Sequence, residues 1–216
     1  MEKGFFITIE ACEGGGKSEL VRRLGEHFKK HNVDFLVTRE PGGSAFGMKV
    51  RELLFNPTYN LPPISDFFLF LADRAEHVEN TIKPALLHGK IVICDRFSLS
   101  TLAIQGTSIG NVGMLRTVEA ISRGGLFPDL TLVLDIEPSI GLRRKTEMGE
   151  VQKFELKDLN FHEEVRESLL QFAEDDPGTI KVIDASVDKD QVFHDALRHI
   201  QLQMGDRFKE FIKAAA

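Results

Sequence analysis

The chain has 216 residues, of which 42% are hydrophobic and 28% charged, with a formal net charge of −6 at pH 7. This length fits one sizeable α/β domain and is too short for two ordinary domains. Because no stretch approaches the roughly 18 apolar residues of a membrane span, and because the chain is acidic, we expect a soluble protein that binds neither membranes nor nucleic acid. The start of the chain shows no secretory leader, which predicts a cytoplasmic location.

Five short runs rich in β-branched and aromatic residues predict the strands of a sheet, at residues 5–9, 35–38, 91–94, 130–134 and 180–183. Helical periodicity appears at residues 17–31, 47–54, 66–88, 111–123, 159–173 and 188–203. Asp66 is the predicted N-cap of the third helix. Strands that alternate with helices are joined by right-handed crossovers, so we expect a three-layer α/β fold with a five-stranded parallel sheet. We expect one domain over residues 1–213, and the three alanines at 214–216 read as a tail remnant.

Residues 10–18, with the sequence EACEGGGKS, have the pattern of a phosphate-binding loop between a strand and a helix. Its small residues let backbone N–H groups surround an anion, and the helix that follows adds its positive dipole end. Lys17 would reach the β- and γ-phosphates, and the Ser18 hydroxyl would ligate Mg²⁺. Ala11 stands where the pattern has glycine, and it fits there if its φ is negative. The predicted contacts to the phosphates of ATP are Glu13, Gly14, Gly15, Gly16, Lys17, Ser18 and Glu19.

Charged residues follow other predicted strands, at the edge of the sheet where open parallel sheets bind ligands. Asp95 is placed to hold Mg²⁺ through water, and Arg96 beside it to clamp a phosphate; a surface ion pair is the alternative. Phe70 and Arg74 lie one helical turn apart, so a planar base could stack on the ring while the guanidinium donates to it. Phe67 and Phe68 are expected in the core, and for Phe70 both roles stay open.

The cysteines and histidines show no spacing typical of a metal site or a catalytic dyad. We expect Cys12 and Cys94 to be reduced, buried thiols at neighbouring strand ends. Four histidines are expected at helix surfaces or helix ends: His77, His88, His162 and His199.

Several motifs around the phosphate-binding loop, in their order and spacing, resemble those of bacterial thymidylate kinases. They are Arg39-Glu40-Pro41-Gly42-Gly43, Leu71-Ala72-Asp73-Arg74, Asp95-Arg96-Phe97 with Ser100, and Gln105-Gly106. The resemblance runs over about residues 4–203. It implies a P-loop kinase fold with a short lid, and transfer of the γ-phosphoryl group of MgATP to dTMP, which gives dTDP for dTTP synthesis. It also implies a homodimer.

The resemblance further implies which residues bind dTMP. Phe70 resembles the ring that stacks on thymine, and Arg74 resembles the donor to its O4. Two positions depart from the family, which usually has Tyr or His at Phe97 and Tyr at Ile104. The implied dTMP contacts are Glu13, Glu40, Pro41, Arg51, Phe70, Arg74, Arg96, Ser100, Thr101 and Gln105, and the implied metal ligands are Ser18 and Asp95.

Residues 143–155 resemble the family's lid, which supplies cations for phosphoryl transfer when the phosphate-binding loop lacks an arginine, as here. Thr146 and Met148 stand where arginines are common, and Lys153 replaces another. A solvated basic helix end is the alternative reading of these cations. The predicted catalytic residues are Lys17, Glu13, Arg96, Arg143, Arg144 and Lys153.

The residues by themselves predict a phosphoryl transferase that acts on a small anionic acceptor, and thymidine specificity enters only through the resemblance. Three alternatives stay open. The protein could be another nucleotide kinase of the same fold, a nucleotide switch without fast chemistry, or an inactive paralogue. The replaced glycine at Ala11 and the depleted lid suggest the last, whereas the missing Asn/Thr-Lys-x-Asp element argues against a guanine-nucleotide switch.

Overall fold

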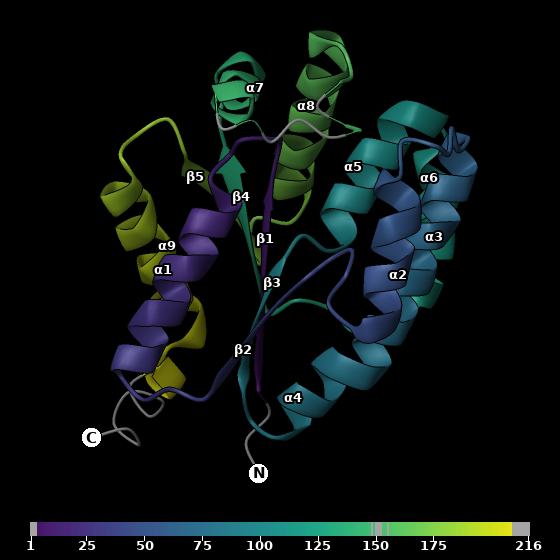
Figure 1. Ribbon diagram of the computed structural model, residues 1–216. Helices are drawn as coiled ribbons and strands as arrows, with labels where there is room; N and C mark the ends of the chain where they lie inside the picture. Colours follow the sequence, from purple (N-terminus) through teal and green to yellow (C-terminus); the bar gives the residue numbers. More distant parts are fainter. Residues whose placement is uncertain (1–3, 148, 150–152, 155, 209–216) are drawn as a thin grey trace.

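In the computed structural model, a single five-stranded parallel sheet lies between two layers of helices (Figure 1). The structure describes residues 4–147, 149, 153–154 and 156–208. The strands are β1 (Phe5–Ala11), β2 (Phe35–Arg39), β3 (Ile91–Asp95), β4 (Leu130–Asp135) and β5 (Ile180–Asp184), in the spatial order β2-β3-β1-β4-β5. The predicted fold class is therefore confirmed.

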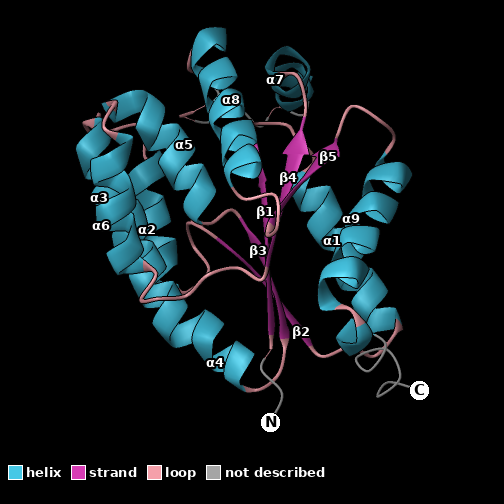
Figure 2. Ribbon diagram, turned by 180° about the vertical axis from the view of Figure 1, so that it is seen from behind, coloured by secondary structure: helices cyan, strands magenta, loops and turns pink. Residues whose placement is uncertain are grey.

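The helices lie in two groups on the two faces of the sheet. They are α1 (Lys17–Lys30), α2 (Ala45–Phe55), α3 (Pro63–His77), the π-helical segment η1 (Val78–Ile82), α4 (Lys83–Leu87), α5 (Ser98–Ile109), α6 (Val112–Ser122), α7 (Pro138–Glu147), α8 (Leu159–Asp175) and α9 (Lys189–Met204). Helices α1 and α9 cover one face, and α4, α5 and α8 cover the other. Helices α2, α3 and α6 form a further group beside α5, as Figures 1 and 2 both show.

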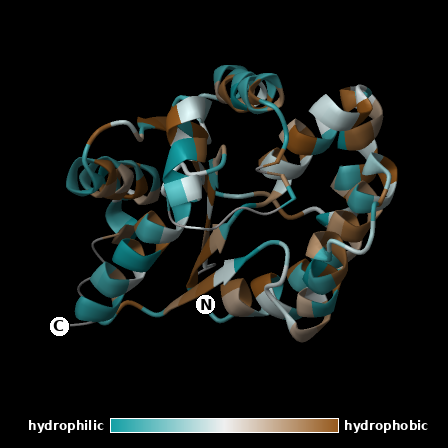
Figure 3. Cartoon of the chain, turned by 45° about the horizontal axis from the view of Figure 1, so that its top comes forward, coloured by the Kyte–Doolittle hydropathy of each residue, from teal (hydrophilic) through white to brown (hydrophobic). Residues whose placement is uncertain are grey.

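The three central strands, β1, β3 and β4, are mostly hydrophobic and buried along nearly their whole length, because helices cover both faces of the sheet. Side chains of successive strand residues point to opposite faces, so Ile7 and Ile9 pack towards α1 and α9, whereas Phe6 packs on the other side. Figure 3 shows the strands as a hydrophobic centre with more hydrophilic helix surfaces outside. The buried hydroxyls of Thr8 and Thr131 bond each other at 2.8 Å, which satisfies both.

Two details of the third predicted helix are wrong. The helix begins at Pro63, so Asp66 is not the N-cap but a buried residue of the first turn, where it accepts from Lys153. Phe67 is fully buried as predicted, but the side chain of Phe68 is 57% exposed. Each residue turns a helix by about 100°, so neighbouring rings in α3 cannot both face the core.

The carboxyl ends of the strands meet at the upper edge of the sheet in Figure 1, beside α7 and α8. Parallel strands all end at this same edge, so the segments that follow β1, β2 and β3 are brought together there. Within the described part of the chain, no helix is both long and apolar enough to cross a membrane.

Candidate active site

A cleft of about 630 Å³ lies at this edge, and most of the predicted site residues line it. They come from the phosphate-binding loop, from the ends of β2 and β3, and from α2, α3, α5 and α7. The predicted residues in its wall are Glu13, Gly14, Gly15, Gly16, Lys17, Ser18, Glu19, Glu40, Pro41, Arg51, Phe70, Arg74, Asp95, Arg96, Ser100, Thr101, Gln105 and Arg144. Arg143 and Lys153 are not among the described residues that line it.

The phosphate-binding loop holds Lys17 beneath its own backbone. The Nζ atom lies 3.4 Å from the Ala11 carbonyl oxygen and 3.3 Å from that of Cys12. Burial and the nearby charge of Arg96 lower the pKa of Lys17. Ala11 is the last residue of β1 and does not have a positive φ, so its replacement of glycine leaves the loop intact, as the sequence predicts. Gly16 precedes α1 with φ of 84°, a conformation that favours glycine.

Ser18 and Asp95 form a pair of oxygen donors beside Lys17. The Ser18 hydroxyl lies 3.4 Å from Oδ2 of Asp95, although 77 residues separate them in the sequence. Asp95 ends β3, and Ser18 is the second residue of α1. Mg²⁺ prefers hard oxygen ligands and commonly binds through one or two protein oxygens together with phosphates. The two residues therefore fit the Mg²⁺ site that the sequence predicts.

Arg96 has a backbone conformation that is unusual for a side-chain-bearing residue, with φ of 69°. Its guanidinium lies 2.5 Å from Oε1 of Glu13, 3.1 Å from the Ala11 carbonyl oxygen and 3.0 Å from Oγ of Ser100. Burial raises the pKa of Glu13, but Arg96 and Lys17 outweigh this and lower it overall. Glu13 is therefore ionised at neutral pH and holds Arg96 at the edge of the cleft.

Glu10, which no sequence pattern singled out, anchors the segment around Arg96 from below. It is fully buried, accepts from the Phe97 backbone N–H at 2.9 Å and accepts from the Ser100 hydroxyl. Burial raises the pKa of Glu10. The one sequence signal for Glu10 is its position as a single carboxylate in a hydrophobic strand. A carboxylate is rarely buried without partners, so this position indicates that Glu10 has a hydrogen-bonding role.

Three arginines gather on the acceptor side of the cleft. Arg39 ends β2 opposite Asp95 of β3, and Arg51 of α2 bonds the Pro41 carbonyl oxygen at 3.2 Å. Burial lowers the pKa of Arg51, and the positive charges of Arg39 and Arg96 lower it further. Guanidinium groups that repel one another favour a bound phosphate, whose oxygens match their planar fork. Arg39 opens the motif at residues 39–43, but its position in the sequence alone predicts no role for it.

The far end of the cleft suits a planar base. The ring of Phe70 is 9% exposed, and the ring of Phe154 lies 6.3 Å from it at 39°. Gln105 is buried, and none of the described residues donates to its Oε1 atom. Buried polar atoms in native proteins nearly always have a partner, so this acceptor points to a ligand. Phe154 was missed by sequence analysis because it comes from the lid, 84 residues after Phe70.

The structure separates the predicted lid cations into two groups. Arg144, whose Nη1 lies 3.5 Å from the Ala185 carbonyl oxygen, lines the cleft together with Lys145. By contrast, Arg143 is 70% exposed and lies 3.9 Å from Glu147. Lys153 bonds both carboxylate oxygens of Asp66, at 2.6 and 2.8 Å. Five lid positions, 148, 150–152 and 155, lie outside the described residues, and Met148 is one of them.

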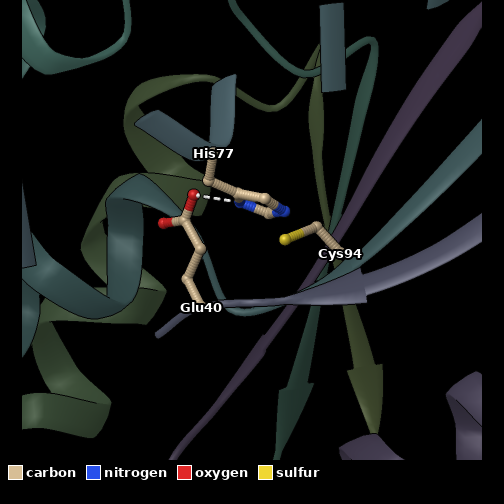
Figure 4. A group of neighbouring side chains, drawn as sticks. All are labelled: Glu40, His77 and Cys94. Atoms are coloured by element: carbon tan, nitrogen blue, oxygen red, sulfur yellow. Dashed lines mark hydrogen bonds and ion pairs between the residues drawn. The ribbon is translucent and has the colours of Figure 1, made fainter. Parts of the chain in front are cut away.

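His77 is the last residue of α3, a helix end as predicted, but it is fully buried behind the cleft, close to Glu40 and Cys94 (Figure 4). Its Nδ1 lies 3.0 Å from Oε1 of Glu40, and its Nε2 lies 2.6 Å from the Thr38 hydroxyl. The Cys94 thiol donates to the Arg96 carbonyl oxygen at 3.0 Å, and burial raises the pKa of that thiol well above its usual value. Because these groups already bond one another and their neighbours, we interpret them as a hydrogen-bonded support for Glu40.

One other expectation about these residue types needs correction. His162 is also buried, with 2% exposure, because it packs below the phosphate-binding loop. Cys12 and Cys94 are both buried and free, as predicted. They lie at the carboxyl ends of β1 and β3, which pair in parallel, so the predicted neighbouring strand ends are confirmed.

Comparisons with known proteins agree with this geometry. A sequence model of the thymidylate kinase family matches residues 9–196. The chain is 42% identical over 192 residues to the thymidylate kinase of Carboxydothermus hydrogenoformans, with 88% of this chain and 94% of that protein covered. It is 44% identical over 186 residues to the thymidylate kinase of Magnetococcus marinus, with 85% and 89% covered.

A solved structure gives the same result. The crystal structure of thymidylate kinase from Ehrlichia chaffeensis matches with a TM-score of 0.75 and 29% identity, and the match covers 93% of this chain and 99% of that one. The fold, the residues gathered in the cleft and the sequence relatives therefore agree, and the chain belongs to the thymidylate kinase family.

Proposed function

We propose that the protein transfers the γ-phosphoryl group of MgATP to the phosphate of dTMP, which forms dTDP and ADP. The supporting observation is that one cleft joins a phosphate-binding loop to a second cationic site and to a polar, aromatic end. The relatives in the same family carry the name of this activity. In the cell, the reaction would supply dTDP for dTTP synthesis.

The donor half of the cleft is built to neutralise the phosphates of ATP. The backbone N–H groups of Gly14, Gly15 and Gly16 and the amine of Lys17 would surround the β- and γ-phosphates. Ser18 and Asp95 would hold Mg²⁺, which supplies further positive charge next to the transferred group. Phosphoryl transfer needs mainly such positioning and charge stabilisation, because its transition state spreads negative charge over three oxygens.

The acceptor half would hold dTMP by its phosphate and by its base. Arg51 and Arg96, with Arg39 beside them, would bind the phosphate, and Glu13 would keep Arg96 in place. Arg144 and Lys145 of the lid helix face the cleft and would stabilise the charge that develops between the two substrates. Arg143 and Lys153 would reach the phosphates only if the lid closes further.

The base would stack on Phe70, with Gln105 accepting from the N3–H of thymine and Arg74 donating to its O4. Cytosine presents an N4 amino group at that place, which faces Arg74 donor to donor. We therefore expect kcat/KM for dCMP to be lower than that for dTMP by on the order of 10³-fold or more. Loss of the thymine methyl group in dUMP costs only about 1 to 3 kcal/mol, so dUMP should rank second.

The experiment is a steady-state comparison of dTMP, dUMP and dCMP at fixed MgATP, with ADP release as the readout. The expected order is dTMP, then dUMP, with dCMP far behind. Efficient use of dCMP would contradict the proposal and favour another nucleotide kinase of this fold. ATP binding without turnover of any acceptor would instead indicate a switch or an inactive paralogue.

We further propose that the protein acts as a cytoplasmic homodimer. Helix α3 carries a line of exposed apolar residues that are spaced at about one helical turn, and none of the described residues covers them: Ile64, Phe68, Ala72 and Ala75. The two free thiols are compatible with a reducing compartment.

A further inference from the structure

Glu119 of α6 is a buried carboxylate that accepts hydrogen bonds from three different segments of the chain. Its Oε1 lies 3.1 Å from Nη1 of Arg74 and 2.5 Å from the Ser98 hydroxyl, and its Oε2 lies 2.9 Å from Nε of Arg123. The residue is 1% exposed and does not line the cleft. Neither the motifs of the sequence nor the proposed reaction assigns it a role.

The contacts of Arg74 explain why this carboxylate matters for the acceptor. Nε and Nη2 of Arg74 lie 2.8 Å from Glu40, and Nη2 also lies 2.8 Å from the Thr101 hydroxyl. The guanidinium stacks over the ring of Phe97 at 4.9 Å. These contacts fix one side of the guanidinium, and Glu119 fixes the Nη1 side.

The Nη1 atom carries two N–H groups, and Glu119 is its only acceptor among the described residues. A guanidinium is planar, so an acceptor on one Nη1 hydrogen fixes the direction of the other. Arg74 also lines the cleft. The second Nη1 N–H is therefore the donor that remains for a ligand.

The charge balance supports the same view. Burial by itself lowers the pKa of Arg74, but Glu40 and Glu119 outweigh it and raise the pKa overall. A buried arginine keeps its position only when carboxylates compensate its charge and satisfy its donors. Arg74 has one such carboxylate on each side.

We propose that Glu119 is a positioning residue for acceptor selectivity: it holds Arg74 so that the remaining Nη1 N–H meets a carbonyl oxygen of the acceptor base. This inference rests on the proposed binding of dTMP. The proposal also explains why an apolar ring suits position 97. The ring of Phe97 supports one face of the Arg74 guanidinium and accepts none of its N–H groups in the plane of the guanidinium.

The test uses Glu119→Gln with Arg123→Met as its matched control. Glutamine keeps the shape of Glu119 but loses its charge, whereas Arg123→Met removes the outer partner of the carboxylate, together with a contact of Arg123 to the ring of Phe127. For Glu119→Gln we expect KM for dTMP to rise about 10- to 100-fold, because a hydrogen bond to a buried charged group is weakened.

We expect kcat at saturation and KM for ATP to stay within about threefold, and the kcat/KM ratio of dTMP over dCMP to fall at least about tenfold. Arg123→Met should leave KM for dTMP within about twofold of wild type.

A second variant, Glu119→Asp, covers the case in which Glu119→Gln does not fold. It keeps the charge for both arginines but shortens the side chain by one methylene, so KM for dTMP should rise while the protein stays folded. An unchanged KM for dTMP and unchanged dTMP/dCMP ratio in either folded variant would overturn the proposal. So would an equal loss in Arg123→Met, since Glu119 would then act only through its outer ion pair. A wild-type protein that does not use dTMP would instead overturn the proposed function, which separates the two failures.

Discussion

Lys17 is a residue whose buried amine serves the reaction more than the fold. Its only partners among the described residues are two loop carbonyl oxygens at 3.3 and 3.4 Å, which are long for hydrogen bonds. We therefore expect Lys17→Ala to fold normally but to lose at least about 10²-fold in kcat, the scale for one donor to developing charge. Steady-state rates with dTMP and MgATP measure this, with Lys30→Ala, an exposed lysine of the same helix, as the control. A folded Lys17→Ala protein with normal kcat would contradict the assignment.

Asp73 makes stability depend on pH. Its Oδ1 accepts from the Gly42 N–H at 3.1 Å, and none of the described residues bonds its buried Oδ2. Burial and the charge of Glu40 raise the pKa of Asp73 from its usual 3.8 to about 6. Between these two values the folded protein binds a proton that the unfolded chain does not, so this carboxyl group contributes stability that is gained as pH falls through 6.

The prediction for Asp73 is a difference between two pH profiles. Relative to Asp73→Asn, the wild-type free energy of unfolding should increase by about 1 kcal/mol between pH 7 and pH 5. Denaturant titrations of both proteins across that range measure it. Parallel profiles would show that Asp73 titrates normally, and a wild-type profile that loses stability relative to Asp73→Asn on acidification would reverse the sign argued here.

Some residues of the candidate site could be predicted from the sequence alone, and others could not. The phosphate-binding loop is contiguous and was predictable, and Phe70 and Arg74 are one turn apart on one helix. Glu119 was not predictable, because its place depends on how α6 packs against α3 and α5. Phe154 likewise reaches the cleft only through the path of the lid. Residue type and spacing therefore identify local chemistry, whereas the groups that support it depend on tertiary packing.

Among the elements, α7 is seated on the phosphate-binding loop by a contact between two backbones. A Cβ atom added to Gly141 would lie 2.1 Å from the Glu13 carbonyl oxygen, and one added to Gly14 would lie 2.0 Å from that of Gly141. Only glycines allow this approach. Arg144 and Lys145 follow Gly141 by about one turn, so the contact sets how they face the cleft.

Gly141→Ala should therefore impair the reaction although alanine is the better helix former. The new methyl group must push α7 away from the loop, and a misplacement of 1 Å costs up to about 10²-fold in rate. Gly113→Ala in α6 is the matched control, since its Cβ would meet nothing closer than 3.9 Å. The control should gain up to about 1 kcal/mol of stability with unchanged kcat, whereas Gly141→Ala should lose kcat and gain nothing. Equal behaviour of the two variants would refute the seating role.

The secondary structure shows why some elements escape sequence analysis. All five strands were predicted, and β1 extends to Ala11 because that residue pairs with Leu134 of β4. Helix α5 was missed because residues 100–106 are buried without interruption, so no helical period appears in its polarity. Helix α7 was missed because it buries only Pro138 and Gly141, and its second half, residues 143–147, is entirely polar. Periodicity predicts an element only when one face differs from the other.

At the scale of the whole molecule, the two halves of the cleft rest on different parts of the fold. The donor half follows directly from β1 and β3, which lie at the centre of the sheet. The acceptor half comes from α2, α3 and α5, of which α2 packs on α3, α3 packs on α5, and α5 packs on α6 and α8. The exposed line of α3 lies on the other side of the helix from Phe70 and Arg74, so a surface that covers it would support the acceptor half from outside.

The last prediction is that this line on α3 forms the interface of a homodimer. Phe68 lies at its centre and is 57% exposed, and burying a large apolar side chain stabilises an interface by about 1.5 to 3 kcal/mol. The wild-type protein should therefore have twice the subunit mass of 24.3 kDa in light scattering after size exclusion. Phe68→Asp should give a folded monomer, because Phe68 is exposed in one chain and two aspartates would face each other across the interface. Leu202→Asp, at a leucine of α9 that is 69% exposed on the opposite face of the sheet, should stay dimeric. A monomeric wild type, or a dimer that survives Phe68→Asp, would place the contact elsewhere or remove it.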